Sequence, residues 1–312
     1  MSAGVADGVH VALPELIALR LRARRFVRPA ARVAGSHSAT RASRFRGRGV
    51  DYAESRIYQP GDDIRQMDWR VTARSGKPHT KLFQEEREQS VLLLVDHNPS
   101  MRFGTHVRFK SVQAARTAAL IAWAAVLGGD RVGVLGFGGG IAAEVKPGGG
   151  ARGALRVLRA LADWDAAAGT AHESLAQALQ RVHRLARPGS RVIVLSDGFS
   201  ADADAAGPLA LLADHCDVVA IVLSDTLELA APPPGRYALR AENHRVLLDF
   251  GQVRTRKDWP RWFAQRRAAF TQVLQQRALR WAMLDTREEP DAVLLHLLGL
   301  DARARGAKAR SA

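Results

Sequence analysis

The run Val91-Leu92-Leu93-Leu94-Val95 decides the fold of this chain, and the polar stretch Asp96-His97-Asn98-Pro99-Ser100-Met101 follows it directly. An uninterrupted apolar run of β-type residues is typical of a strand buried on both faces of a parallel sheet. The same signature recurs at residues 131–137, 191–195 and 217–223, and in weaker form at 279–284. We therefore expect these segments to form one sheet.

Helical patterns separate the predicted strands. Apolar residues recur at helical spacing in residues 110–127, 154–161, 173–186, 258–277 and 290–298. Strands that alternate with helices of crossover length imply a parallel sheet covered on both faces. Residues 141–145 follow their predecessor across only three glycines, which is too short for a crossover, so we expect an antiparallel edge strand there. The predicted fold class is α/β, with a doubly wound, mostly parallel, Rossmann-type sheet.

Most of the positive charge lies in the two ends of the chain. The formal net charge is +15, residues 1–50 carry ten arginines against Asp7 and Glu15, and residues 303–312 carry four more basic residues. Such ends favour nucleic acid or an acidic membrane surface, because clustered cations release counterions from phosphate. Residues 20–48, however, contain only Phe26 and Phe45 as aromatic residues, so stacking platforms for bases are missing. Binding through the arginine-rich termini stays an alternative function.

Cysteine content and hydropathy favour a cytoplasmic protein. Cys216 is the only cysteine, which excludes an internal disulfide and a cysteine-based zinc site and fits a reducing compartment. The longest largely apolar run, residues 117–127, is far shorter than the roughly 20 residues that a membrane-spanning helix needs. The first residues also lack the basic start and apolar stretch of a secretory signal. We expect no transmembrane segment.

Polar side chains follow two of the predicted strands at their carboxyl ends, where open α/β sheets bind ligands. Asp96, Asn98 and Ser100 follow the first strand, and Asp197 follows the strand at 191–195. Thr170 precedes the helix at 173–186. Carboxylate, hydroxyl and amide oxygens are hard donors that suit an octahedral Mg²⁺ or Mn²⁺. The sequence therefore predicts that these five side chains gather at one edge of the sheet.

The pattern of Asp96, Asn98 and Ser100, then Thr170, then Asp197-Gly198 resembles the metal-ion-dependent adhesion site of von Willebrand factor type A domains. The resemblance implies a Mg²⁺ cofactor, or Mn²⁺, held directly by the hydroxyls of Ser100 and Thr170 and largely through water by Asp96 and Asp197. Asn98 stands where that family has a serine, so it is either a ligand or a brace that closes the loop. The ion would accept a carboxylate from a partner as a further ligand.

A second motif lies upstream. Arg56-x-Tyr58-x-Pro60-Gly61-Asp62-Asp63-x-Arg65-x-x-Asp68-Trp69-Arg70-x-Thr72-Ala73-Arg74 resembles the signature of the bacterial domain-of-unknown-function fifty-eight family, which directly precedes a type A domain. The signature fits a network of acidic and basic side chains around a glycine turn, or alternatively a partner-binding surface. Trp69 is expected to anchor a core. The residues of interest are Gly61, Asp62, Asp63, Arg65, Asp68, Trp69 and Arg74.

Proteins of that family are often encoded beside MoxR-type AAA+ ATPases. The resemblance therefore implies a non-enzymatic adaptor that works with a MoxR-type AAA+ ATPase and a client protein, in chaperone-like maturation or metal insertion. A metal-dependent hydrolase is a further alternative, with His97 as the nearest base, although we expect His97 at the surface. The expected domains are a basic helix and linker (1–45), the signature segment (46–89), the type A-like domain (90–300) and a basic tail (301–312).

Overall fold

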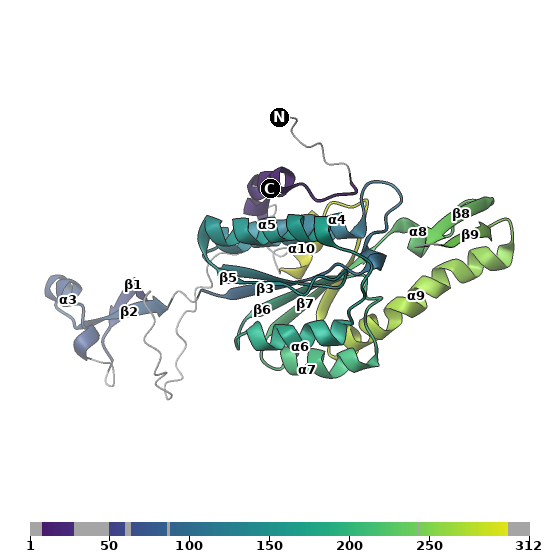
Figure 1. Ribbon diagram of the computed structural model, residues 1–312. Helices are drawn as coiled ribbons and strands as arrows, with labels where there is room; N and C mark the ends of the chain where they lie inside the picture. Colours follow the sequence, from purple (N-terminus) through teal and green to yellow (C-terminus); the bar gives the residue numbers. More distant parts are fainter. Residues whose placement is uncertain (1–7, 28–49, 60–63, 86–87, 242–243, 299–312) are drawn as a thin grey trace, which may run out of the picture. The chain divides into compact units, whose positions relative to one another are not determined.

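The computed structural model describes residues 8–27, 50–59, 64–85, 88–241 and 244–298 (Figure 1). The chain divides into two compact units. The smaller unit is Pro29–Glu88, and the larger one combines Met1–Arg28 with Gln89–Ala312. Among the described residues, no helix has both the length and the apolar character needed to cross a membrane.

A six-stranded sheet forms the centre of the larger unit, in the order β10-β7-β6-β3-β4-β5. Its strands are β3 (Ser90–Asp96), β4 (Arg131–Phe137), β5 (Glu144–Gly148), β6 (Arg191–Ser196), β7 (Asp217–Ser224) and β10 (Arg280–Asp285). All neighbours pair in parallel except β5, which runs antiparallel to β4 at the edge. This confirms the predicted doubly wound, mostly parallel sheet with an antiparallel edge strand. The strand order reverses between β3 and β6, and this switch point is where such sheets bind ligands.

The edge strand begins three residues later than the pattern predicted. Gly138, Gly139 and Gly140 all have positive φ, and Ile141 bridges back to Gly138. The glycines therefore complete a turn that includes Ile141 before β5 can pair with β4.

Helices cover both faces of the sheet (Figure 1). One face carries α4 (Lys110–Leu127), α5 (Gly150–Ala167) and α10 (Asp291–Leu297), and the other carries α6 (Leu175–Leu185) and α7 (Ala206–Ala213). Strand β3 contributes to both cores, because Leu93 packs on the α4 side while Leu92 and Leu94 pack on the α6 side. Burial on both faces explains why this strand has no polar position between Val91 and Val95.

The first helices of the chain belong to the larger unit. Helices α1 (Leu13–Ala18) and α2 (Arg20–Ala23), with the 3₁₀ turn Arg24–Phe26, bury Leu16 and Phe26 in the core on the α4 side. The Trp123 indole N–H donates to the carbonyl of Leu16 at 3.1 Å. Arg22 pairs with Glu289 and Asp291. The segment expected to be a basic helix is thus a packed element with an apolar side.

An arm interrupts the strand–helix alternation between β7 and β10. It consists of α8 (Thr226–Leu229), the hairpin β8 (Arg236–Ala241) and β9 (His244–Asp249), and α9 (Val253–Gln276). The hairpin and the first half of α9 extend beyond the carboxyl end of the sheet (Figure 1). Edge-to-face aromatic contacts run from Tyr237 through Phe250 and Trp259 to Phe263, with ring centroids 5.0–5.6 Å apart. The helical pattern at residues 258–277 predicted most of α9, whereas the hairpin was not predicted.

The smaller unit pairs β1 (Val50–Ile57) with β2 (His79–Glu85) antiparallel and carries α3 (Trp69–Ser75) between them. Asp68 is the N-cap of α3, because its Oδ1 accepts the backbone N–H groups of Arg70 and Val71 and its Oδ2 accepts the Ser55 hydroxyl at 2.6 Å. The helix ends at Ser75, and its C-cap residue Gly76 has a φ of 68°.

Trp69 does not anchor a core, and the prediction for it is wrong. Its side chain is 67% exposed. Thr72 rather than Trp69 connects α3 to β2, and its hydroxyl accepts the backbone N–H of His79 at 2.9 Å. Arg65 and Arg74 are also exposed. Gly61, Asp62 and Asp63 lie outside the described residues.

Candidate functional site

Asp96 ends β3 at the switch point and is fully buried. Its Oδ1 accepts the backbone N–H and the side-chain Nδ2 of Asn98, both at 2.8 Å. Its Oδ2 accepts the hydroxyls of Ser196 at 2.6 Å and Ser200 at 3.1 Å. Burial and the negative charge of Asp197 raise the pKa of Asp96 to about 7, although the hydrogen bonds from Ser196 and Asn98 oppose this shift. Four donors therefore fill the lone pairs that a carboxylate offers.

Asn98 closes the loop after β3. Its Nδ2 also donates to the carbonyl of Glu173 at 3.0 Å, and its Oδ1 accepts the backbone N–H of Glu173 at 2.9 Å. The Glu173 carboxylate in turn accepts the Gly138 N–H and pairs with Arg181. Both ends of the Asn98 amide are thus engaged with the protein, and the geometry is that of a brace between β3 and the start of α6.

The second predicted carboxylate, Asp197, binds a buried lysine. Lys110 Nζ lies 2.7 Å from Asp197 Oδ2 and 2.5 Å from Glu228 Oε1, and the Lys110 side chain is 0% exposed. Arg267 Nη1 donates to the other Glu228 oxygen at 3.0 Å. Burial opposes the charge of Lys110, but the carboxylates of Asp197 and Glu228 outweigh it and raise the pKa of the lysine. Burial raises the pKa of Glu228.

The two predicted hydroxyl ligands lie apart from these bonds. Ser100 is half-buried in the 3₁₀ turn Pro99–Met101, and Thr170 is exposed in the loop between α5 and α6. The Thr170 loop is tied to the glycine turn, since Gly169 N–H donates to Gly139 O and Gly139 N–H donates to Ala171 O, both at 2.7 Å. Within the described part of the chain, neither hydroxyl hydrogen-bonds to Asp96 or Asp197.

This arrangement does not fit a divalent cation. The Asp96 oxygens already accept four hydrogen bonds, and Asp197 accepts the Lys110 ammonium and the Phe199 N–H. Asn98 Oδ1 is engaged with Glu173. Across the ranges that the structure describes, no group of three or more His, Cys, Asp or Glu side chains is placed to hold a metal ion. An ion bound to Asp96 would have to displace Asn98 or the serine hydroxyls, and an ion bound to Asp197 Oδ2 would have to compete with Lys110.

His97 is buried rather than at the surface, so the prediction for it is wrong. Its N–H donates to the carbonyl of Phe137 at 2.7 Å, which carries the β3–β4 pairing one residue further and places the ring against Trp164. Burial, with a contribution from the charge of Arg102, lowers the pKa of His97 to about 4. Both ring nitrogens are buried without a hydrogen-bond partner among the described residues. The imidazole is therefore neutral at pH 7 and hydrogen-bonds to no nucleophile among the described residues.

Carboxylates also lie at the carboxyl ends of β7 and β10, which were not predicted to contribute to the site. Asp225, just after β7, accepts hydrogen bonds from the hydroxyls of Thr105 and Thr286, both at 2.6 Å. Burial opposes ionisation of Asp225, but these hydrogen bonds outweigh it and lower its pKa. Asp285, at the end of β10, accepts the Thr226 hydroxyl at 2.9 Å. The signal was available, because Ser224-Asp225 follows an apolar strand just as Asp96 does.

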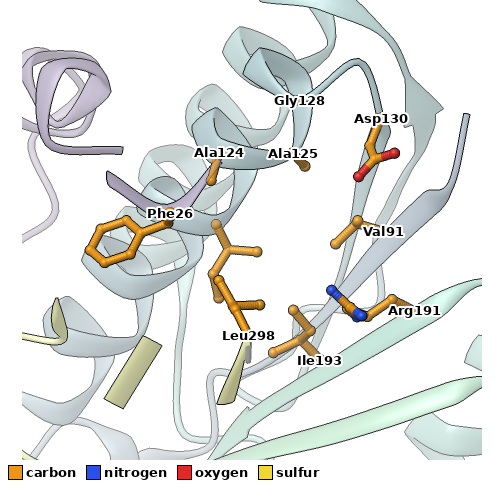
Figure 2. Close-up of a pocket in the computed structure, with 10 residues that line it drawn as sticks. Phe26, Val91, Ala124, Ala125, Gly128, Asp130, Arg191, Ile193 and Leu298 are labelled. Atoms are coloured by element: carbon orange, nitrogen blue, oxygen red, sulfur yellow. The ribbon is translucent and has the colours of Figure 1, made fainter. Parts of the chain in front are cut away.

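A cavity of about 30 Å³ lies at the opposite, amino edge of the sheet (Figure 2). Figure 2 shows the polar groups of Asp130 and Arg191 on one side of it, and the apolar side chains of Phe26 and Leu298 on the other. This volume accommodates a water molecule or two and is far below the roughly 300 Å³ of a small ligand pocket. The cavity is therefore a packing feature of the core.

The chain is similar to known proteins in sequence and in structure. A family model described as "Protein of unknown function DUF58" matches residues 54–269. The chain is 31% identical over 264 residues to the uncharacterized proteins Rv1480 of Mycobacterium tuberculosis and Mb1516 of Mycobacterium bovis, which covers 84% of this chain and 82% of each relative. Among solved structures, the conserved hypothetical protein BatB from Bacteroides thetaiotaomicron matches 69% of this chain and 98% of its own, with 15% identity and a TM-score of 0.47.

Proposed function

The chain belongs to the DUF58 family, and we propose that it acts as a non-enzymatic protein-interaction module, an adaptor. This proposal rests on the hydrogen bonds at the switch point, which engage its polar side chains with one another. The hydroxyls of Ser196 and Ser200 donate to Asp96, and the imidazole of His97 has no partner among the described residues. Nucleophilic and general-base catalysis both need a nucleophile or water within reach of a base. These bonds instead favour a rigid scaffold.

The arm supplies the surface through which we propose that the adaptor binds. Several large apolar side chains on it are exposed, namely Leu229, Val246, Leu247, Val253 and Trp262. These side chains lie on three elements of the arm, α8, β9 and α9, and contiguous exposed apolar patches mark interaction sites. Helix α9 also presents four exposed basic residues, Arg254, Lys257, Arg261 and Arg266, and one exposed acidic residue, Asp258. This combination of apolar and basic groups fits an acidic protein surface.

The partner that we propose is a MoxR-type AAA+ ATPase, with a client protein as the third component. The upstream signature supports this choice through the resemblance described above, and the basic arm suits an acidic face of such a partner. In this role the adaptor would present the client to the ATPase for chaperone-like maturation. The signature residues that remain candidates for a partner contact include Arg65, Trp69 and Arg74, all exposed.

Binding between the purified protein and a purified MoxR-type AAA+ ATPase tests the proposal. We expect a complex with the wild-type chain, weakened by about tenfold or more when Arg254, Lys257 and Arg261 are all changed to Glu. A matched control changes the exposed Arg152, Arg159 and Arg184 to Glu, so that the net charge is equal. Absence of a wild-type complex, or equal weakening by both triple variants, would contradict the proposal.

Nucleic acid bound through the arginine-rich termini remains the alternative partner. Two of the N-terminal arginines are already engaged, because Arg22 pairs with Glu289 and Asp291 and Arg20 lies over the Trp123 ring. Titration with single- and double-stranded DNA and RNA at two salt concentrations would reveal any remaining affinity. Nucleic-acid binding tighter than ATPase binding would favour the alternative.

A further inference from the structure

Lys110 stands in an unfavourable place for its charge. It is the first residue of α4, and a cation at a helix N-terminus opposes the helix dipole. It is also fully buried, and burying an ammonium costs far more than it returns unless the charge is paired and hydrogen-bonded. The stability of α4 therefore does not explain this residue. The two carboxylates within 2.7 Å of its Nζ do.

The ion pairs around Lys110 are balanced. Asp197 and Glu228 contribute two negative charges, and Lys110 and Arg267 contribute two positive ones. All four side chains are almost completely buried. Both carboxylates of this group are already paired with a cation, so neither is left to balance the two positive charges of an added divalent ion.

Two aromatic rings lie next to the Lys110 ammonium. Phe199 lies 4.7 Å and Phe103 lies 5.8 Å from Nζ, measured to the ring centroids. Rings at this distance attract the cation and exclude water. Among the described residues, two carboxylates and two aromatic rings therefore surround the ammonium.

We propose that the ammonium group of Lys110 is the built-in cation of the carboxyl edge of this sheet, in place of a bound divalent metal ion. It neutralises Asp197, one of the residues that the type A pattern assigns to the ion. It also joins the arm to the body of the domain, because Glu228 lies on α8 and its second partner Arg267 lies on α9. The domain consequently folds, and keeps its arm in place, without metal.

The inference is independent of any partner, so the tests use the full chain alone and leave the adaptor proposal untouched by their outcome. The first test measures Mn²⁺ binding by electron paramagnetic resonance and the melting temperature in EDTA and in excess Mg²⁺. We expect free Mn²⁺ signals throughout and the same Tm, within about 1 °C, in both buffers. Saturable Mn²⁺ binding that is lost in Asp96→Ala or Asp197→Ala would overturn the proposal.

The second test removes the cation. Lys110→Met leaves a buried carboxylate without its partner, so we expect a Tm about 10 °C lower and faster proteolysis within residues 226–276. The matched control is Lys146→Met, at an exposed lysine, which should leave both readouts unchanged. A Lys110→Met protein as stable and as resistant as the wild type would overturn the proposal.

A double variant guards against a Lys110→Met protein that does not fold. Lys110→Met with Asp197→Asn removes one charge of each sign and leaves Glu228 paired with Arg267. We expect it to recover at least half of the Tm lost in Lys110→Met, because the uncompensated charge is gone. A double variant that melts no higher than the single variant, or does not fold while Lys110→Met does, contradicts the charge balance on which the proposal rests.

Discussion

The backbone N–H of Glu173 donates to Asn98 Oδ1 at 2.9 Å, while Asn98 Nδ2 donates back to the carbonyl of Glu173 at 3.0 Å. This two-way amide pair joins the end of β3 to the segment before α6. The third hydrogen bond of this side chain runs from Asn98 Nδ2 to Asp96 Oδ1. The side chain that differs from the type A pattern is thus the one that fixes the loop.

Replacement of Asn98 by the serine of the type A pattern should therefore destabilise the protein. Asn98→Ser removes three side-chain hydrogen bonds in a buried place, and we expect a loss of about 2–3 kcal/mol in the free energy of unfolding, measured by urea denaturation. Gln265→Ser, at an exposed position of α9, is the control and should change stability by less than about 0.5 kcal/mol. Wild-type stability of the Asn98→Ser variant would show that the pair is dispensable.

Removal of the Asp96 carboxylate tests the same loop from its other end. Asp96→Ala leaves the buried hydroxyls of Ser196 and Ser200 and the amide of Asn98 without their acceptor, so we expect a loss of about 3 kcal/mol or more. Denaturation with and without Mg²⁺ should give the same loss, because the carboxylate is bonded to protein donors. A loss that appears only in the presence of Mg²⁺ would instead support the metal site that the resemblance implies.

The sheet was predictable from sequence because each strand carries its own signal. Residues 91–95, 191–195 and 217–223 are largely apolar runs typical of strands covered on both faces, and they become β3, β6 and β7. The positions of Asp96 and Asp197 at the carboxyl edge follow from the same signal. Both lie at the switch point, where the Ser196 hydroxyl before Asp197 donates to Asp96.

The partners of these carboxylates were not predictable, because buried ion pairs depend on which distant elements meet. Lys110 and Glu228 lie 118 residues apart, and no local pattern relates them. The exposure of Trp69 and the burial of His97 likewise follow from tertiary packing. The hairpin β8–β9 was missed since its strands mix basic and apolar residues without strict alternation.

Asp217 should make stability depend on acid pH. It begins β7 and bonds to Arg191 on β6 at 2.7 Å and to Arg280 on β10 at 2.6 Å, so it links three neighbouring strands. Burial raises its pKa, but the hydrogen bonds from Arg280 and Arg191 outweigh burial and lower it. A carboxylate with a lowered folded-state pKa stabilises the fold above its unfolded pKa of about 4, and this contribution is lost as the pH falls through the folded value.

Melting temperatures between pH 6 and about pH 3 check this expectation. Asp217→Asn should lower the Tm at pH 6, and the difference from the wild type should shrink as the pH falls. Asp214→Asn, at an exposed aspartate nearby in sequence, is the control and should track the wild type at every pH. A difference for Asp217→Asn that stays constant over the whole range would mean that the carboxylate charge is not what stabilises these strands.

Phe26 tests whether the N-terminal helices are part of the domain. Its ring is buried in the core beside α4, whereas Leu21 on the preceding helix is 73% exposed. Phe26→Ala should cost about 3–5 kcal/mol in the free energy of unfolding, and Leu21→Ala less than about 0.5 kcal/mol. Equal, small effects would mean that residues 13–26 are an appendage. If Phe26→Ala is severely destabilising, deletion of the basic N-terminus would unfold the domain. Tests of the arginine-rich termini must then replace arginines individually and keep residues 8–27 intact.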